Sequence, residues 1–565
     1  MNKKLLCISL LTVLLITSCQ TDDSISEETQ QQLDYNISTD ASALQKAINF
    51  NETGVVGIAN ITNNRSMDAG AVFGIEEIAS LEPPVIDATV LRATHVDVKG
   101  DFAYVSYNKE GAKYLGAIDI LDISDKYNAK LISRLTSNIM DINSLFVDNN
   151  GYLVFTGASA KDNRGADNHS LIGYIKLING DFAHALSNET DDVRNSPISN
   201  LDYGNSGNAG VHILNFNGEA IAVSGDAGAI TRFSYPGMLT AFDGKASEEI
   251  GDLRYAALNN NTLAVLSGSE GLMNFNVNEN FTLSSKISIA PLTAESKRTI
   301  AWYGDNILVS EGIDGAGIYN FNAGARLTRL SLKMHPDASE INTEDKVTNA
   351  VSTDGNFIYM ANGGAGLDIL KLDEDLNPIA EGIAEINGSA NFVQAKGEYI
   401  YVASGSGLKI LKIVAPETNM DTGDFLACSD FETYKGGKNL TIPSNSAASY
   451  SGLMNLKHLN VNGTLDFCGE MLVEKGANLS SASTLNMSGN FKLGNNKSSD
   501  NLVINANSTF KIDGLIEIHG DLQINSGGTL EFIGDDSKVF VSGEVKINSG
   551  GKVIGDFEDL NNKFI

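Results

Sequence analysis

The stretch that decides the fold reads HVDVKG (95–100), FAYV (102–105), GAIDILDI (116–123) and KLIS (130–133). Each piece is short, rich in β-branched or aromatic residues, and followed by turn-forming residues, which is typical of strands. Four strands in about forty residues match the length of one blade of a β-propeller. The stretch therefore predicts a four-stranded blade.

The middle strands of this unit recur down the chain. Later copies span 221–230, 263–272, 307–319, 358–370 and 400–411, and a divergent copy spans 145–177. The spacing averages about 50 residues, which favours a propeller over a helical solenoid. We therefore expect seven blades between His95 and Ile413, within a propeller domain over residues 51–415. Val85–Leu91 is the candidate for the strand that closes the ring, because the seventh unit supplies only three strands.

The C-terminal part of the chain repeats at a different interval. Asn525-Ser526-Gly527-Gly528 recurs 23 residues later as Asn548-Ser549-Gly550-Gly551, and Gly463, Gly489 and Gly514 each begin a short predicted strand. This interval predicts a short parallel β-solenoid over residues 436–565, after a junction at 416–435. A β-sandwich built of hairpins is the alternative. The expected fold class is therefore all-β.

The propeller strands resemble a known repeat. An apolar strand, Ala/Tyr-Val, Gly-Leu-x-Ile and Asp-Ile-Ser-Asp together look like the LVIVD repeat of bacterial cell-surface β-propellers, and Gly116–Asp125 is the best match. The later units lack the Asp-Ile-Ser-Asp ending. The resemblance covers residues 90–415 and implies a fold and a cell-surface location, without a defined activity.

The N-terminus predicts export. Lys3 and Lys4 precede the apolar run Leu5–Ile16, which is too short to span a bilayer and is typical of a signal peptide over residues 1–18. The run ends in Ile16-Thr17-Ser18-Cys19, which resembles the bacterial lipobox. That resemblance implies that Cys19 carries lipid, including palmitate, and anchors the chain to a membrane.

The residues after Cys19 predict where the anchor faces. Gln20, Asp22 and Asp23 resemble the export signal that directs lipoproteins of the Bacteroidota to the cell surface. The alternative is that these acids only solvate a tether, which we expect over residues 19–50. The expected location is the outer membrane, with the protein facing the exterior.

The composition of the chain limits the kinds of partner and cofactor that it can bind. The 565 residues include 70 acidic and 40 basic side chains, for a net charge of −30, which argues against a nucleic-acid partner. Cys428 and Cys468 are the cysteines left after Cys7 and Cys19, and an exported protein favours a disulfide between them. Spacing alone does not decide that pairing. No zinc, EF-hand or other metal motif is present, and no cofactor is expected.

Few residues predict chemistry. His95 and His212 occupy similar places on innermost strands, where they would line the channel and contact a ligand; the alternative is that each bonds to backbone or water. Trp302 and Tyr303 would form a stacking platform for a sugar if exposed, and otherwise pack between blades. We find no nucleophile elbow, phosphate loop or other catalytic motif, and nominate no catalytic residue.

These features predict a surface-exposed lipoprotein that acts by binding, adhesion or scaffolding and captures an unknown glycan or protein ligand. The competing interpretation is a carbohydrate-active enzyme, a polysaccharide lyase or hydrolase, with its site at the propeller channel. A shared fold does not exclude it.

Overall fold

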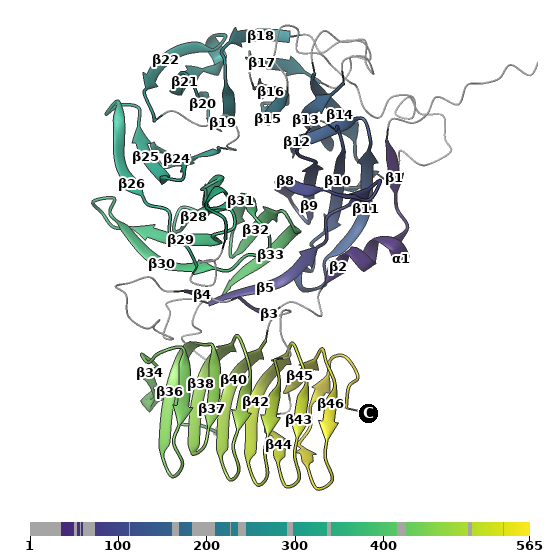
Figure 1. Ribbon diagram of the computed structural model, residues 1–565, viewed down its shortest axis with the longest axis vertical. Helices are drawn as coiled ribbons and strands as arrows, with labels where there is room; N and C mark the ends of the chain where they lie inside the picture. Colours follow the sequence, from purple (N-terminus) through teal and green to yellow (C-terminus); the bar gives the residue numbers. More distant parts are fainter. Residues whose placement is uncertain are drawn as a thin grey trace, which may run out of the picture. The chain divides into compact units, whose positions relative to one another are not determined.

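The computed structural model describes residues 35–49, 54–56, 58–59, 74–111, 113–160, 169–182, 209–225, 228–235, 244–290, 298–335, 341–414, 425–494, 500–534 and 536–564. Residues Tyr35–Ile565 form one compact unit. Within it, a seven-bladed β-propeller is followed by a parallel β-solenoid (Figure 1), as the two repeat intervals predict.

Blades 1 to 4 are antiparallel sheets whose strands pair in chain order. Their strands are β8 (Arg92–Lys99), β9 (Phe102–Asn108), β10 (Gly116–Asp122) and β11 (Lys130–Ser137); β12 (Met140–Val147), β13 (Tyr152–Ser159) and β14 (Ser170–Lys176); β15 (Gly210–Phe216), β16 (Glu219–Ser224), β17 (Ala229–Ser234) and β18 (Gly244–Glu249); and β19 (Leu253–Asn259), β20 (Thr262–Ser267), β21 (Gly271–Asn276) and β22 (Thr282–Ile287). Apolar side chains from neighbouring blades pack together, so each sheet is buried on both faces.

Blades 5 to 7 have the same design. Their strands are β23 (Ile300–Tyr303), β24 (Asn306–Gly312), β25 (Gly315–Asn320) and β26 (Ala325–Leu330); β27 (Ala350–Thr353), β28 (Ile358–Ala361), β29 (Leu367–Leu372) and β30 (Pro378–Ala384); and β31 (Ala390–Lys396), β32 (Tyr399–Ser404) and β33 (Gly407–Val414). The first strand of each blade contacts the first strand of the next, and β31 contacts β8, so the first strands form a closed ring around the channel (Figure 1).

The strand that completes blade 7 is β5 (Gly74–Leu81), and the prediction of Val85–Leu91 for this role is wrong. β5 pairs antiparallel with β33 and joins the two ends of the propeller. Seven of its eight residues are buried, whereas Val85 and Val90 are each 61% exposed. The latter two belong to a small hairpin of β6 (Val85–Ile86) and β7 (Thr89–Val90). Val85–Leu91 is no less apolar than β5, but β5 pairs with β33 at seven positions and its two glutamates, Glu76 and Glu77, form ion pairs with Lys492 and Lys409.

The segment before β5 adds short strands to the outer edges of three blades. β1 (Asn36–Ser38) pairs with β11, β2 (Ile48–Asn49) and β3 (Gly54–Val55) pair with β5, and β4 (Ile58–Ala59) pairs with β30. Between β1 and β2 lie α1 (Ala41–Leu44) and the 3₁₀ turn η1 (Gln45–Ala47). The tether predicted over 19–50 is therefore wrong for residues 35–49, because Leu44 and Ile48 are buried against the propeller.

Side chains at the start of the first strands fasten blade to blade. A β-bulge turns residue 94 of β8 toward blade 2, where Thr94 Oγ1 donates to Ile142 O at 3.0 Å. A bulge at the same place in β31 lets Asn391 Nδ2 donate to Ala93 O at 3.2 Å, which links blade 7 to blade 1. Equivalent bonds run from Asn143 to Gly210 O and from Asn349 to Ala390 O. We call these side chains the latch residues.

The solenoid winds through two parallel sheets. One contains β35 (Asn439–Ile442), β37 (His458–Val461), β39 (Ala477–Leu479), β41 (Leu502–Ile504), β43 (Leu522–Ile524) and β46 (Val545–Ile547), and the other contains β34 (Glu432–Thr433), β36 (Ala447–Leu456), β38 (Thr464–Val473), β40 (Thr484–Leu493), β42 (Thr509–Ile518), β44 (Thr529–Phe532), β45 (Lys538–Val541), β47 (Lys552–Ile554) and β48 (Glu558–Asp559). The described pairings between these strands are all parallel, which excludes the β-sandwich of hairpins.

Two ladders explain the repeated residues of the solenoid. Gly469, Gly489 and Gly514 stack in register at positive φ and bend the long strands at their middle. These glycines therefore lie within strands rather than at their starts, and Gly463 lies outside the ladder, in a turn. In the turns, Asn548 Nδ2 donates to Asn525 Oδ1 at 2.7 Å, and the asparagine ladder continues through the turns before it.

A buried ionic cluster joins the propeller to the solenoid. Lys492 Nζ of β40 lies 2.8 Å from Glu76 Oε2 of β5, 3.7 Å from Glu517 Oε2 of β42 and 3.8 Å from Glu470 Oε1 of β38. Burial would lower the pKa of Lys492, but the carboxylates outweigh it and hold that pKa well above its usual value. We call these four residues the Lys492 cluster.

The surroundings of the Lys492 cluster reinforce the same junction. Burial would raise the pKa of Glu517, yet the hydrogen bond from His519 and the charge of Lys492 together lower it to about 2. Apolar contacts among Val55, Val414, Leu453 and Leu472 lie at the same junction. Both domains therefore supply partners for the same buried charge.

Candidate functional site

The structure brings His95 and His212 together at the propeller channel. They lie on the first strands β8 and β15, each directly after the bulge, with ring centroids 5.6 Å apart. The positions after the bulges of β12, β19 and β31 hold Ser144, Tyr255 and Phe392. The shared register places these side chains at one level of the channel.

Packed rings fill this level of the channel. The His95 ring lies 4.3 Å from that of Phe392, and the His212 ring stacks on Tyr255 at 3.6 Å. The exposed fractions of the two histidines are 8% and 5%. Burial, followed by the neighbouring charge of His95, lowers the pKa of His212 well below its usual value, so its imidazole is neutral at pH 7.

The hydrogen bonds of this layer are structural. Ser144 Oγ and His212 Nδ1 are 2.9 Å apart. Asp97 of β8 accepts a hydrogen bond from the Val147 backbone N–H at 2.8 Å, and burial raises its pKa despite that bond and the nearby Lys396. Within the part of the chain that the structure describes, no group of three or more His, Cys, Asp or Glu side chains is arranged to hold a metal ion. Both histidines are therefore buried among side chains of neighbouring blades.

Trp302 and Tyr303 do not form one stacking platform. Trp302 packs between blades 4 and 5, where its Nε1 donates to Ala257 O at 3.0 Å. Tyr303 packs with the cluster between blades 5 and 6. Successive residues of a strand point to opposite faces, which sends the two rings into different blade interfaces.

One buried carboxylate of the propeller, Asp368, differs from the buried Asp119 of blade 1, which pairs with an arginine. Asp368 of β29 is 1% exposed, and among the described residues no side chain donates a hydrogen bond to its oxygens. Burial raises its pKa to about 7, although the charge of Lys333 opposes the shift. In blade 1 the buried Asp119 instead pairs with Arg134 at 2.6 Å. Asp368 is therefore a titrating group near neutral pH.

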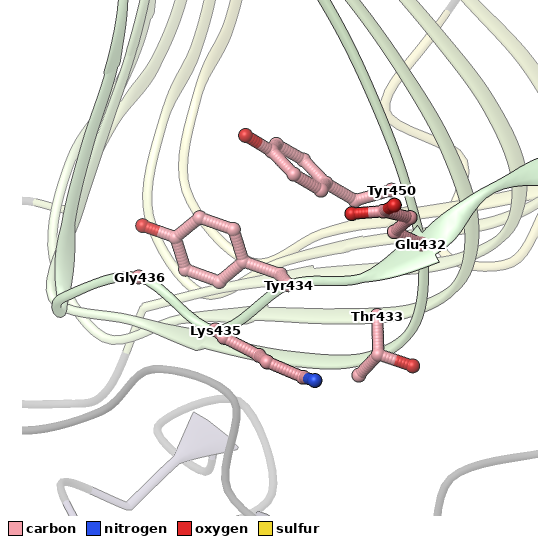
Figure 2. Close-up of a pocket in the computed structure, with 6 residues that line it drawn as sticks. All are labelled: Glu432, Thr433, Tyr434, Lys435, Gly436 and Tyr450. Carbon is pink, nitrogen blue, oxygen red and sulfur yellow. The ribbon is translucent and has the colours of Figure 1, made fainter.

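An open pocket lies at the first turn of the solenoid. Its volume is about 570 Å³, and it is lined by Glu432, Thr433, Tyr434, Lys435, Gly436 and Tyr450. Figure 2 shows the rings of Tyr434 and Tyr450 on one side of the β34 segment and Lys435 and Thr433 on the other. The ring centroids are 5.0 Å apart at an angle of 72°. Small-ligand sites are concave and combine aromatic side chains with polar groups that orient the ligand, and this pocket contains both kinds of group.

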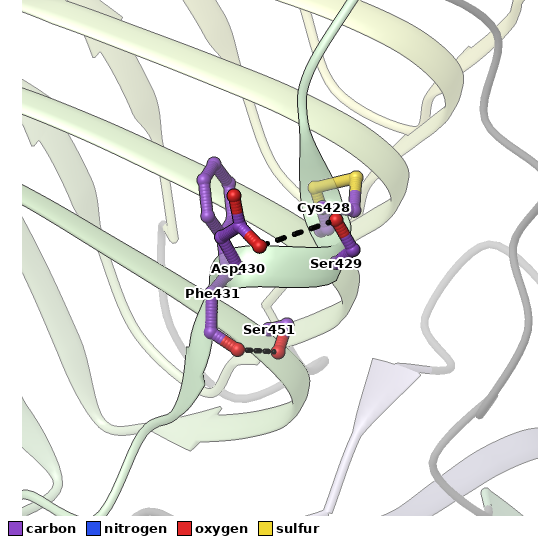
Figure 3. The surroundings of a disulfide bond; sticks show 6 residues. Cys428, Ser429, Asp430, Phe431 and Ser451 are labelled. Carbon is purple, nitrogen blue, oxygen red and sulfur yellow. Dashed lines mark hydrogen bonds between the residues drawn. A yellow bond between two sulfur atoms is a disulfide. The ribbon is translucent and has the colours of Figure 1, made fainter.

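A disulfide fastens the segment that forms the pocket. Cys428, in the 3₁₀ turn η8 (Cys428–Asp430), is bonded to Cys468 of β38 (Figure 3). Ser451 Oγ donates to Phe431 O at 2.8 Å. Since β34 pairs with β36 through only two residues, these two links hold the pocket-forming segment against the solenoid.

No sequence motif predicts this pocket. Tyr434 and Tyr450 lie on successive turns, and each is an isolated tyrosine in the sequence. The predicted lipid and export residues, Cys19, Gln20, Asp22 and Asp23, lie outside the described residues. Among the residues that are described, no helix combines the length and the apolar character needed to cross a membrane.

Sequence comparison supports the repeat. The LVIVD repeat family matches residues 92–136, 347–371 and 387–418, which correspond to blade 1, most of blade 6 and the first three strands of blade 7. The protein is thus a β-propeller protein with a C-terminal solenoid. Its propeller carries LVIVD repeats. No curated protein matches the chain.

Solved structures of other proteins are similar to this chain. The WD40 β-propeller domain of Doa1 is 11% identical with a TM-score of 0.40, over 59% of this chain and 95% of that chain. Virginiamycin B lyase from Staphylococcus aureus is 16% identical with a TM-score of 0.41, over 60% and 99%. At these values the similarity assigns neither a ligand nor an activity.

Proposed function

We propose that the protein is a lipid-anchored outer-membrane protein of the Bacteroidota type that works on the cell surface by binding, as an adhesin, a scaffold or a capture protein for glycans. The Lys492 cluster is the observation that carries the proposal. It ties the propeller strand β5 to three solenoid strands through one buried cation. Two large repeat surfaces joined in this way suit the binding of extended ligands.

The experiment that tests binding uses the full-length protein purified in detergent. It is incubated with a panel of soluble polysaccharides, and both retention of each polysaccharide and release of reducing or unsaturated ends are measured. Retention without release supports a binding function. Release of new ends identifies the protein as a lyase or hydrolase and overturns the non-enzymatic proposal.

The location is tested on intact cells. Protease shaving should remove the protein from wild-type cells, and replacing Asp22 and Asp23 with alanine should protect it, because the export signal is lost. Labelled palmitate should enter the wild-type protein but not a Cys19→Ala variant. Equal shaving of both strains contradicts the export role of the two aspartates.

A further inference from the structure

The pocket of Figure 2 is open at the start of the solenoid stack. It is formed by the segment 432–436 and by Tyr450 of the next turn, in which Glu432 pairs in register with Tyr450. Glu432, Thr433 and Lys435 are exposed, Tyr450 is half-buried, and Tyr434 is buried. The ring of Tyr450 is therefore partly exposed to solvent and packs edge-to-face against the buried ring of Tyr434 (Figure 2).

The side chains that line the pocket limit the class of ligand that it can bind. The lining carries one carboxylate, Glu432, and one ammonium group, Lys435, so it has no net charge, and Lys435 and Thr433 lie on the other side of the β34 segment from the two rings. Tyrosine rings bury apolar C–H surface and keep a polar hydroxyl at the edge. A carboxylate accepts hydrogen bonds and an ammonium group donates them. A sugar ring presents this combination of a C–H face and surrounding hydroxyls.

We propose that this pocket is a carbohydrate-binding subsite that takes one neutral pyranose unit of a glycan, with the Tyr450 ring against the C–H face and Glu432 accepting hydrogen bonds from ring hydroxyls. The assignment rests on the proposed binding function and adds the site and the ligand class. Lys435 and Thr433 lie at the rim, where they contact the neighbouring unit of the glycan.

The pocket is preorganised for such a ligand. The disulfide at Cys428 and the Ser451–Phe431 hydrogen bond lie directly before β34 in the sequence, and Tyr434 donates its hydroxyl proton to Gly437 O at 2.9 Å. These links fix the β34 segment before a ligand arrives. Less conformational entropy is then lost on binding, which favours affinity for a small group.

The test measures binding of the full-length protein in detergent to neutral hexasaccharides of glucose, mannose, xylose and galactose by isothermal titration calorimetry. For the hexasaccharide that binds, we expect Tyr450→Ala to weaken binding at least about tenfold, or about 1.4 kcal/mol. Glu432→Gln should weaken it several-fold. Tyr450→Phe keeps the ring and should retain most of the affinity. Tyr152→Ala, a half-buried tyrosine of β13 in the propeller, is the matched control and should bind as the wild type does.

The outcomes separate this inference from the function on which it rests. Binding that is unchanged in Tyr450→Ala overturns the pocket assignment and leaves a glycan-binding function with its site elsewhere. Absence of binding to every hexasaccharide, while the wild type still retains polysaccharides, overturns the neutral-pyranose assignment alone. Absence of both kinds of binding overturns the assignment together with glycan capture. Near-UV circular dichroism and the intact mass of the disulfide form show that each variant has folded.

Discussion

Replacing Lys492 with methionine should destabilise the junction between propeller and solenoid by about 3–5 kcal/mol, because it removes the cation beside the buried carboxylates of Glu76 and Glu470, while Glu517 keeps its hydrogen bond with His519. At an effective dielectric constant near 20, each charge pair about 4 Å apart attracts by about 4 kcal/mol before desolvation is counted. The three oxygens lie 2.8, 3.7 and 3.8 Å from Nζ. Desolvation offsets most of this gross attraction, which leaves the smaller net loss.

The assay is urea unfolding followed by two signals. Trp302 is the only tryptophan of the chain and belongs to blade 5, so its fluorescence reports on the propeller. Far-UV circular dichroism reports on the strands of both domains. In the wild type the two transitions should coincide, and in Lys492→Met they should separate because the domains no longer unfold together.

Two further variants test whether the Lys492 cluster stabilises the junction between the two domains. Lys538→Met removes an ion pair of similar length, 2.8 Å to Glu558, but both side chains are about half exposed, so the expected loss of stability is much smaller than in Lys492→Met. Adding Glu76→Gln to Lys492→Met should recover part of the lost stability, since one uncompensated charge is removed. If Lys492→Met lowers the unfolding free energy by less than about 1 kcal/mol and the two transitions still coincide, the Lys492 cluster does not hold the two domains together.

Three other outcomes follow from buried groups. Burial raises the pKa of Asp368 from about 3.8 to about 7, so the contribution of this side chain to stability falls as pH rises through that interval. Asp368→Asn should therefore be more stable than the wild type by about 1–4 kcal/mol at pH 8 and equally stable near pH 4. Urea unfolding of both proteins at the two pH values measures this difference. Asn391→Leu removes the hydrogen bond to Ala93 O and should lower the unfolding free energy by about 1–3 kcal/mol. A loss below about 0.5 kcal/mol contradicts a role of this bond in ring closure. The Cys428–Cys468 disulfide closes a loop with a sequence separation of 40. Its reduction should lower the unfolding free energy by about 3–4 kcal/mol. Equal urea midpoints with and without dithiothreitol would argue against this effect.

The blades were predictable because each is a local pattern. Strands such as Phe102–Asn108 and Gly116–Asp122 follow one another within a few tens of residues and carry their own turn residues. The closing strand carried no such pattern. Gly74–Leu81 lies far from its partner β33 in the sequence, and its apolar residues do not repeat the blade motif. The position of this strand depends on the partners that its residues find in the folded protein, which include Lys492 for Glu76 and Lys409 for Glu77.

The candidate site was less predictable than the fold. His95 and His212 were placed correctly on the first strands, because the repeat aligns their positions. Their packing against Phe392 and Tyr255 was not visible, since those rings come from other blades. The Tyr434–Tyr450 pocket depends on how one solenoid turn stacks on the next.

The sequence by itself determined the two repeat domains of this protein, since the strand and turn patterns that define them are local. It also determined the acidic charge, and it predicts an export signal at the N-terminus. Only the tertiary structure decided that β5 closes the ring, that Lys492 lies among carboxylates of two domains, and that two isolated tyrosines line one pocket. Each of these features joins residues far apart in the chain or on successive turns. They form only when folding buries apolar surface and brings those residues into contact.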